Sequence, residues 1–360
     1  MTDPHPADLA GTTRRRFVLR GLGGLGALAT APLLLAACGD DEDTSSPGAN
    51  AGSSADGPWS FTDDRGTKIS LDKRPQRIIA YDTAASALWY QGIVPTAVFG
   101  AAPLKDNTSL AGLDVSKTQS VGEVYGEINL EKLAALKPDL IVTAYDPEQT
   151  VLFGFKDEKQ QKKVQSFAPI VAIDAIPLPT KVIDRFGALA ASLGADPKAA
   201  GRDEQRQRFD AAVTKLRETA AAHKDVAVVA VAGFEDGLYF ARPARFPALK
   251  EYQGWGVNFV DTGIKPRNSA KKFDPADFWT VVSYERADAF PADLIMHDVQ
   301  AGSLTLAGLA KKPTWRSLPA VKAGQLVEWQ KVQAWSYPLY TKEIELVTAG
   351  LERANAGLVT

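Results

Sequence analysis

The sequence of 360 residues contains very little sulfur and very little imidazole. Cys38 is the one cysteine, which excludes a disulfide within the chain. The three histidines, His5, His223 and His297, are scattered and leave few ligands for a zinc or iron site. We therefore expect no resident metal ion and no cofactor.

The sequence also lacks an excess of charge of either sign. It has 41 Lys+Arg against 43 Asp+Glu, a formal net charge of −2. Nucleic-acid-binding proteins usually present a strongly basic face, so this balance argues against a nucleic-acid partner. The content of 45% hydrophobic and 23% charged residues is typical of a globular protein, and the length suggests roughly two domains.

The first 37 residues have the pattern of an export signal. Arginines 14–16 precede an uncharged stretch over residues 21–37, and Leu35-Ala36-Ala37-Cys38 matches a bacterial lipobox. We predict a twin-arginine lipoprotein signal peptide over residues 1–37, lipidation of Cys38 and anchoring at the outer face of the cell membrane. The alternative is a transmembrane helix with a buried thiol, but the stretch is short and rich in glycine.

A glycine pattern in the same region has no structural context. Residues 21–26 match G-x-G-x-x-G, but an arginine-rich tail precedes them and a cleavage site follows. A dinucleotide site needs a strand before this pattern and a helix after it. We therefore discard it. Residues 38–57 contain acidic and small residues without large apolar ones, which predicts a flexible tether.

The remaining sequence alternates between strand and helix patterns. A hairpin over Trp59–Leu71 is followed by predicted strands at Arg77–Tyr81, Val94–Phe99, Asp139–Thr143 and Ile170–Ile173. Helices are predicted at Thr83–Gln91, at Asn129–Leu136 with Asn129 as N-cap, and at Thr180–Leu193. Such alternation favours an α/β lobe with a mostly parallel sheet flanked by helices, which we place at residues 58–195.

A long helix then separates this lobe from a second one. Residues 196–223 contain one proline and one glycine near their start, and predict a rod of roughly 40 Å. The α/β pattern restarts at residues 224–360, with predicted strands at Val226–Val231, Gly237–Ala241, Asn258–Val260, Asp293–Met296 and Gln325–Trp329 and a closing helix at Tyr340–Ala354. The predicted fold is two α/β lobes joined by one long backbone helix.

Four segments of this sequence match a known family in order and spacing. They are Arg74–Ala80; Val121–Glu123 with Asn129–Leu133 and Leu136–Ile141; Ser283–Glu285 with Ala292–Ile295; and Trp315–Gly324. With these segments the chain resembles the bacterial substrate-binding lipoproteins of iron–siderophore ABC importers, a helical-backbone family that includes cobalamin and haem binders. The resemblance implies a monomer that binds its ligand between the lobes and delivers it to a permease dimer.

The resemblance also implies two carboxylates that dock onto the permease. By motif, these are Glu131 in the amino-terminal lobe and Glu285 in the carboxyl-terminal lobe. Each falls at the start of a predicted short helix. A glutamate is also favoured there by the helix dipole alone, which is the alternative explanation.

Aromatic and arginine residues gather in the loops after predicted strands, where open α/β sheets bind ligands. Aromatic rings provide flat apolar walls, and arginine provides a fork of donors. Each residue alone is more often a packing aromatic or a solvated base than a ligand contact. As a set, we predict that the ligand-binding residues are Tyr81, Tyr125, Tyr145, Arg242, Arg245, Trp255, Trp335 and Tyr337.

The charge of these loops bears on the ligand. A triply anionic catecholate complex would need a dense basic pocket, whereas the arginine-poor loops of the amino-terminal lobe favour a ferric hydroxamate. Cobalamin or haem in the same fold is the alternative, although histidine is scarce for haem. An exported two-domain hydrolase is a further alternative, but no Gly-x-Ser-x-Gly or HExxH motif is present. We expect a binding protein without catalytic residues.

Overall fold

The computed structural model describes residues 57–196, 198, 201–263, 278–300, 302–331 and 335–359. The predicted signal peptide, Cys38 and the predicted tether, apart from Gly57, lie outside the described residues. Within the described part of the chain, helices are either too short or too polar to span a membrane.

The predicted hairpin is confirmed. Strands β1 (Trp59–Thr62) and β2 (Lys68–Leu71) pair antiparallel. The turn between them is held by the buried carboxylate of Asp63, which accepts hydrogen bonds from Thr67 N at 3.0 Å and from Ala172 N at 3.1 Å. This carboxylate therefore fixes the turn and attaches the hairpin to the strand that contains Ala172.

The amino-terminal lobe is built on a six-stranded sheet of order β5-β4-β3-β6-β7, with β8 paired to β6. All pairs are parallel except β6 with β7. The central strands are nearly continuous runs of buried apolar residues, as expected of a sheet covered on both faces. The strands are β3 (Ile78–Tyr81), β4 (Ala97–Phe99), β5 (Gln119–Gly122), β6 (Leu140–Asp146), β7 (Val151–Leu152) and β8 (Ile170–Asp174).

In the described part of this lobe, four helices connect these strands; those at Asp82–Tyr90, Leu130–Ala135 and Pro179–Ser192 confirm predicted helices, whereas the one at Glu158–Gln165 was not predicted. The side chain of Asn129 accepts a hydrogen bond from Lys132 N at 2.9 Å, which confirms it as the N-cap of α2. Three short 3₁₀ turns, η1 (Leu104–Asp106), η2 (Thr108–Leu110) and η3 (Val115–Lys117), lie between β4 and β5. The helices are α1 (Asp82–Tyr90), α2 (Leu130–Ala135), α3 (Glu158–Gln165) and α4 (Pro179–Ser192).

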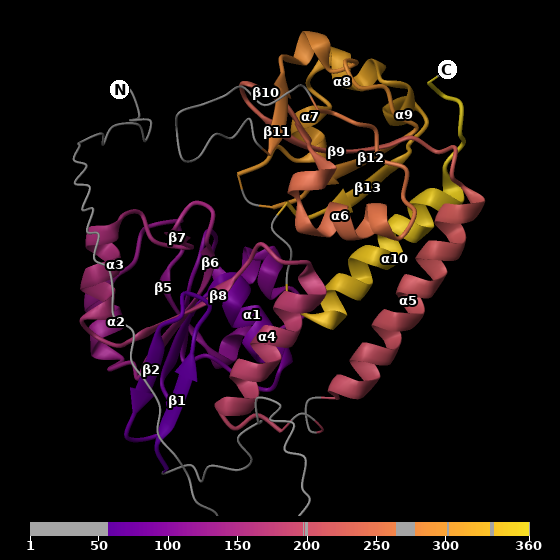
Figure 1. The fold of residues 1–360 in the computed structure, drawn as a ribbon. Coiled ribbons are helices and arrows are strands. Elements are labelled where there is room, and N and C mark those ends of the chain that lie inside the picture. Colours follow the sequence, from indigo (N-terminus) through magenta and orange to yellow (C-terminus); the bar gives the residue numbers. More distant parts are fainter. Residues whose placement is uncertain are drawn as a thin grey trace, which may run out of the picture. The chain divides into compact units, whose positions relative to one another are not determined.

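The long helix is shorter than predicted and does not stand alone. Helix α5 (Arg202–Ala222) begins after Gly201, whose φ of +62° is incompatible with continuing the helix backwards. The last helix, α10 (Tyr337–Arg353), runs beside it (Figure 1). Phe209 of α5 contacts Tyr337 and Tyr340 of α10 at ring-centroid distances of 5.0 and 5.5 Å. The backbone between the lobes is thus a pair of packed helices, where the sequence predicted one rod.

The carboxyl-terminal lobe has a five-stranded sheet of order β11-β10-β9-β12-β13. Its β9–β12 and β12–β13 pairs are parallel, and β10 is antiparallel to both its neighbours, so the sheet is mixed. The predicted strand at Asn258–Val260 forms only an isolated bridge to Val228. The strands are β9 (Val228–Phe234), β10 (Gly237–Ala241), β11 (Trp279–Val282), β12 (Leu294–Asp298) and β13 (Leu326–Trp329).

Short helices fill the connections of this second lobe. Proline stands at the first positions of α6, α8 and α9, where its fixed φ suits the start of a helix. They are η4 (Pro243–Arg245), α6 (Pro247–Gly254), η6 (Tyr284–Arg286), α7 (Leu306–Leu309), α8 (Pro313–Ser317) and α9 (Pro319–Lys322). One buried apolar cluster includes residues of both sheets and of α4, α5, α6 and α10.

A buried polar network joins α4, α6 and α10 within that cluster. Glu251 of α6 is 7% exposed and accepts hydrogen bonds from Tyr340 OH at 2.6 Å and Thr180 Oγ1 at 2.8 Å. Tyr252 OH donates to Glu343 Oε1 at 2.7 Å. Burial raises the pKa of Glu251 and raises the pKa values of Tyr252 and Tyr340 well above their usual range.

The raised pKa of Glu251 predicts a pH-dependent stability. Because the folded protein binds this proton more tightly than the unfolded chain, the free energy of unfolding falls as pH rises from the ordinary glutamate pKa to the folded one. We expect Glu251→Gln to flatten this part of the pH profile in urea denaturation between pH 4 and 8. Glu345→Gln, an exposed position of the same α10 that carries Glu343, is the control. An unchanged slope in Glu251→Gln would contradict the prediction.

Candidate functional site

A cavity of about 300 Å³ lies between the two lobes, and we call it the interlobe cavity. The amino-terminal lobe contributes residues that follow β6 and β8. The carboxyl-terminal lobe contributes the start of α6, the edge strand β11 and the residues after β13. The lining residues are Asp146, Gln149, Phe153, Ala175, Ile176, Pro179, Phe246, Pro247, Ala248, Phe278, Trp279, Trp329, Gln330, Lys331 and Trp335. The cavity thus lies at the carboxyl ends of strands from both sheets.

Three aromatic rings form its wall in the carboxyl-terminal lobe. Phe246 packs edge-on against Trp279 at 4.7 Å and against Trp329 at 5.6 Å, measured between ring centroids. The indole of Trp329 is fixed because its Nε1 donates to Val231 O at 3.1 Å. These rings were not among the predicted ligand-binding residues. Trp329 is the last residue of a strand that the sequence did predict. The expectation that ligand-binding residues follow strands could therefore have identified it.

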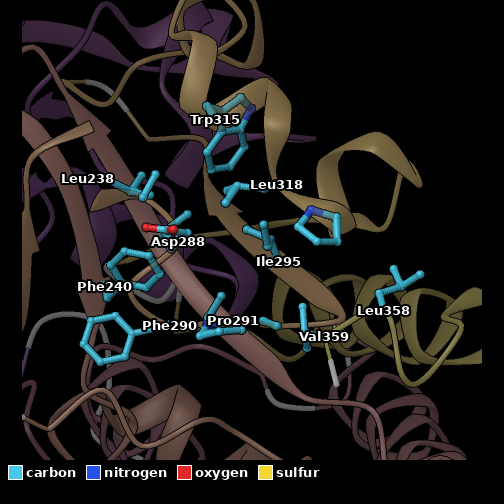
Figure 2. Close-up of a pocket in the computed structure, with 15 residues that line it drawn as sticks. Leu238, Phe240, Asp288, Phe290, Pro291, Ile295, Trp315, Leu318, Leu358 and Val359 are labelled. Atoms are coloured by element: carbon cyan, nitrogen blue, oxygen red, sulfur yellow. The ribbon is translucent and has the colours of Figure 1, made fainter. Parts of the chain in front are cut away.

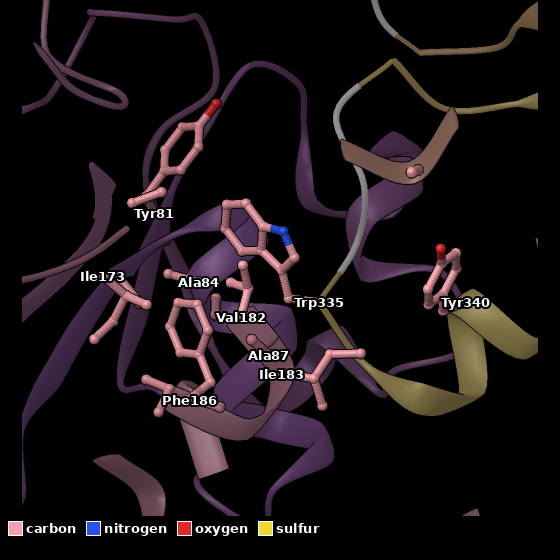
Figure 3. Close-up of a cluster of buried hydrophobic side chains, with 14 of the residues drawn as sticks. Tyr81, Ala84, Ala87, Ile173, Val182, Ile183, Phe186, Trp335 and Tyr340 are labelled. Carbon is pink, nitrogen blue, oxygen red and sulfur yellow. The ribbon is translucent and has the colours of Figure 1, made fainter. Parts of the chain in front are cut away.

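Trp335 is the predicted ligand-binding residue that lines the interlobe cavity. Its indole stacks on Phe186 of α4 at 5.6 Å with an interplanar angle of 16° (Figure 3). It is 3% exposed, so one face of the ring belongs to the apolar core and its edge reaches the cavity wall. The stack holds the segment before α10 against the amino-terminal lobe.

Two predicted tyrosines lie behind the cavity wall: Tyr81 contacts the lining residue Phe153, and Tyr125 contacts Tyr81. Tyr81, at the end of β3, lies 6.3 Å from Phe153, which lines the cavity, and 6.3 Å from Tyr125. The Tyr81 hydroxyl points away from the cluster around Phe186 (Figure 3). Tyr81 is buried and Tyr125 is 48% exposed. Burial raises the pKa of both phenols, so both are neutral hydrogen-bond donors at physiological pH.

A glycine permits this group of rings to form. Gly154 has φ +82°, and a Cβ atom there would lie 2.5 Å from ring atoms of both Phe99 and Tyr81. The backbone of Gly154 is also a hydrogen-bond partner of the Tyr125 phenol. A larger residue would have to displace the rings that support the amino-terminal wall.

Of the two predicted arginines, Arg245 lies beside the interlobe cavity. Arg245 lines an adjoining cavity of about 330 Å³ that shares Ile176, Pro247 and Phe278 with the interlobe cavity. It forms an ion pair with Glu148 of the other lobe at 3.1 Å, and its guanidinium lies 5.1 Å from the ring of Phe278. Arg242 N-caps η4, and its buried Nε has no hydrogen-bond partner among the described residues.

Six of the eight predicted ligand-binding residues line neither cavity: Tyr81, Tyr125, Arg242, Tyr145, Trp255 and Tyr337. Tyr145 is half-buried in β6, between Leu152 and Asp174 of the neighbouring strands. Trp255 packs against Phe209 and Tyr340, inside the α5–α6–α10 cluster.

Tyr337, two residues after Trp335, packs mainly against α5. Its ring packs on Phe209, and its hydroxyl contacts Arg206 at 2.7 Å and Asp184 at 3.2 Å, while burial raises its pKa to about 12. Ser336 caps α10 between the two residues, so the first helical turn directs Tyr337 onto α5. Tyr337 and Trp255 therefore pack between helices in this structure and line neither cavity.

The two predicted docking glutamates are both exposed. Glu131 lies in the first turn of α2 and Glu285 in η6. A hydrogen bond from the Ser283 side chain lowers the pKa of Glu285, so this carboxylate is ionised at neutral pH. Both positions are accessible to a protein partner.

A second cavity, of about 370 Å³, lies within the carboxyl-terminal lobe (Figure 2). Its walls are core side chains, among them Phe240, Ile295 and Trp315, and Asp288 is the one charged residue among the described residues that line it. The interlobe cavity differs because it combines aromatic walls with charged groups of both signs. We therefore take the interlobe cavity as the candidate site.

The described residues bring no three His, Cys, Asp or Glu side chains together as metal ligands. His297 is buried in β12, and burial lowers its pKa, so its imidazole is neutral at pH 7. Its Nδ1 has no hydrogen-bond partner in this part of the structure.

The comparison with known proteins identifies the family. The sequence profile of the periplasmic binding protein family matches residues 78–332, and the chain belongs to this family. No curated protein matches the chain. Members of the family are binding proteins rather than enzymes. They act outside the cytoplasm and work with ABC importers.

Solved structures share the same fold. DesE, a ferric-siderophore receptor protein from Streptomyces coelicolor, is 34% identical with a TM-score of 0.75, over 83% of this chain and 99% of DesE. SirA from Staphylococcus aureus, complexed with staphyloferrin B, is 20% identical with a TM-score of 0.56, over 82% and 99%. FhuD2 from Staphylococcus aureus, with bound ferrioxamine B, is 18% identical with a TM-score of 0.52, over 77% and 98%. The last two show the fold alone.

The contact of Gly154 with two rings leads to a prediction. We expect Gly154→Ala to lower the free energy of unfolding by about 1–3 kcal/mol more than Gly112→Ala does, because overpacking adds to backbone strain. Gly112 has a similar φ of +80°, but the nearest atom to its added Cβ would be Tyr90 OH at 3.5 Å. Thermal and urea denaturation measure the difference. Equal losses in the two variants would show that the rings move freely.

Proposed function

We propose that the protein binds a ferric siderophore, of the hydroxamate type, in the interlobe cavity. The observation that carries the proposal is a cavity between the lobes whose aromatic walls come from both of them. Flat apolar rings suit the surface of a bulky, semi-polar iron chelate, and a few polar groups orient it. The similarity to the ferric-siderophore receptor DesE over most of both chains supports the same cargo class.

The balance of charge supports the hydroxamate class. The charged lining residues of the two cavities are Asp146, Glu148, Arg245, Lys250 and Lys331. Lys331 is paired with the buried Asp298 and Arg245 with Glu148, so most of the positive charge is already neutralised. A triply anionic complex would lack counter-charges here, whereas a ferric trihydroxamate of low net charge would not.

Fluorescence titration tests this function. Trp279, Trp329 and Trp335 line the cavity, so a ferric complex bound there should quench their emission. We expect ferrioxamine B to quench at lower concentration than ferric enterobactin, haemin or cobalamin. Trp335→Phe should reduce the amplitude, and Trp59→Phe, in the hairpin, serves as control. Preference for the catecholate would overturn the hydroxamate class, and failure of both siderophores to bind would overturn the function.

We further propose that the protein acts as a lipid-anchored monomer on the outer face of the cell membrane. The twin-arginine pattern and the lipobox ending at Cys38 support export and anchoring. The mass of the mature amino-terminal peptide would show whether Cys38 is acylated.

Delivery to an ABC importer permease is proposed to use Glu131 and Glu285. Both are exposed carboxylates, one on each lobe. We expect Glu131→Ala and Glu285→Ala to reduce cellular uptake of the ferric complex severalfold, while the affinity in solution stays unchanged, because neither residue lines the cavity. Glu204→Ala, in the first turn of α5, controls for loss of a helix-start charge. Normal uptake by the double variant would exclude this docking mode.

A further inference from the structure

Lys331 is a cation at the wall of the interlobe cavity. It lies two residues beyond Trp329, the last residue of β13, and lines the interlobe cavity with Trp279 and Trp329. Its side chain is 22% exposed. A partly buried ammonium interacts more strongly with an anionic oxygen than one in bulk water does, because the local dielectric is lower.

A buried carboxylate fixes this cation at two points. Asp298 ends β12, and its side chain is fully buried. Its Oδ1 accepts a hydrogen bond from the Lys331 backbone N at 3.0 Å, and its Oδ2 accepts one from Lys331 Nζ at 2.7 Å. Ser303 Oγ donates to the same Oδ2 and accepts from Lys331 Nζ at 3.2 Å. The lysine is therefore held from both its main chain and its ammonium.

The Lys331–Asp298 pair differs from an ordinary structural ion pair in the positions of its two charged residues. The carboxylate is enclosed behind the strand ends, whereas the lysine lies at the cavity wall. Because Asp298 compensates the charge, the pair presents a directed donor without adding net positive charge to the cavity. Such a donor suits an oxygen with partial negative charge on a complex of low net charge.

We propose that Lys331 is a specificity-determining contact, whose ammonium binds an iron-coordinating oxygen of a ferric hydroxamate, and that Asp298 and Ser303 are its positioning residues. This inference rests on the proposed function and adds to it the group that distinguishes ligands by charge. The sequence did not indicate Lys331, because its partner Asp298 is 33 positions away.

Paired substitutions test the contact without leaving a buried charge unpaired. Lys331→Met alone would leave the buried Asp298 carboxylate without its cation. The main variant is therefore Lys331→Met combined with Asp298→Asn. We expect it to bind ferrioxamine B about 10- to 100-fold more weakly than the wild type, the loss typical of a hydrogen bond to a charged group. Lys331→Arg should keep most of the affinity. Lys322→Met, an exposed lysine at the end of α9, is the matched control.

Asp298→Asn alone tests whether Asp298 positions Lys331 for the ligand or only stabilises the fold. With the lysine uncompensated, we expect weaker binding of ferrioxamine B and tighter binding of the anionic ferric enterobactin. A purely structural role would instead lower the melting temperature and leave the ratio of the two affinities unchanged.

Failure of this inference can be told apart from failure of the proposed function. If the wild type binds neither ferric complex, the proposed function is wrong and the inference falls with it. If the wild type binds ferrioxamine B and the double variant binds it equally well, Lys331 is not a ligand contact, while the proposed function stands.

Discussion

Packing of α10 along α5 is the interaction on which the rest of the site depends. Phe209 inserts between Tyr337 and Tyr340, and the same buried cluster extends into both sheets. Because α10 starts directly after the stack of Trp335 on Phe186, this packing also places the cavity wall. Helix packing and site geometry are thus one continuous set of contacts, in which Tyr337 and Tyr340 join the two helices.

The site itself combines apolar walls with charges that are already paired. Lys331 with Asp298, and Arg245 with Glu148, each leave little net charge beside the aromatic rings. Charges in such surroundings are costly unless they are compensated. The two pairs therefore keep donors close to the cavity without making it a strong anion trap. This is the physical basis of the proposal that the ligand is a large chelate of low net charge.

Much of the fold could be predicted from local sequence patterns. The hairpin, the buried strands of the first lobe and the Asn129 cap follow from alternation, apolar runs and side-chain capping, which depend on neighbours in the sequence. The predicted helix begins several residues before Arg202, where α5 actually starts. The sequence pattern remains helical there, but the positive φ of Gly201 ends the helical conformation. The antiparallel direction of β10 has no local signal, since strand pairing is a property of the sheet.

Local patterns in the sequence are sufficient for the class of protein: two α/β lobes, a helical connection between them and the motifs that the periplasmic binding protein family shares. They also indicate that aromatic residues gather after strands. Which of these residues meet a cavity depends on contacts between distant parts of the chain. Trp335 lies at the cavity and Tyr337 lies against α5, although two positions separate them, because Ser336 between them caps the helix that begins at Tyr337. Likewise, Lys331 pairs with Asp298 through a contact that no local pattern encodes.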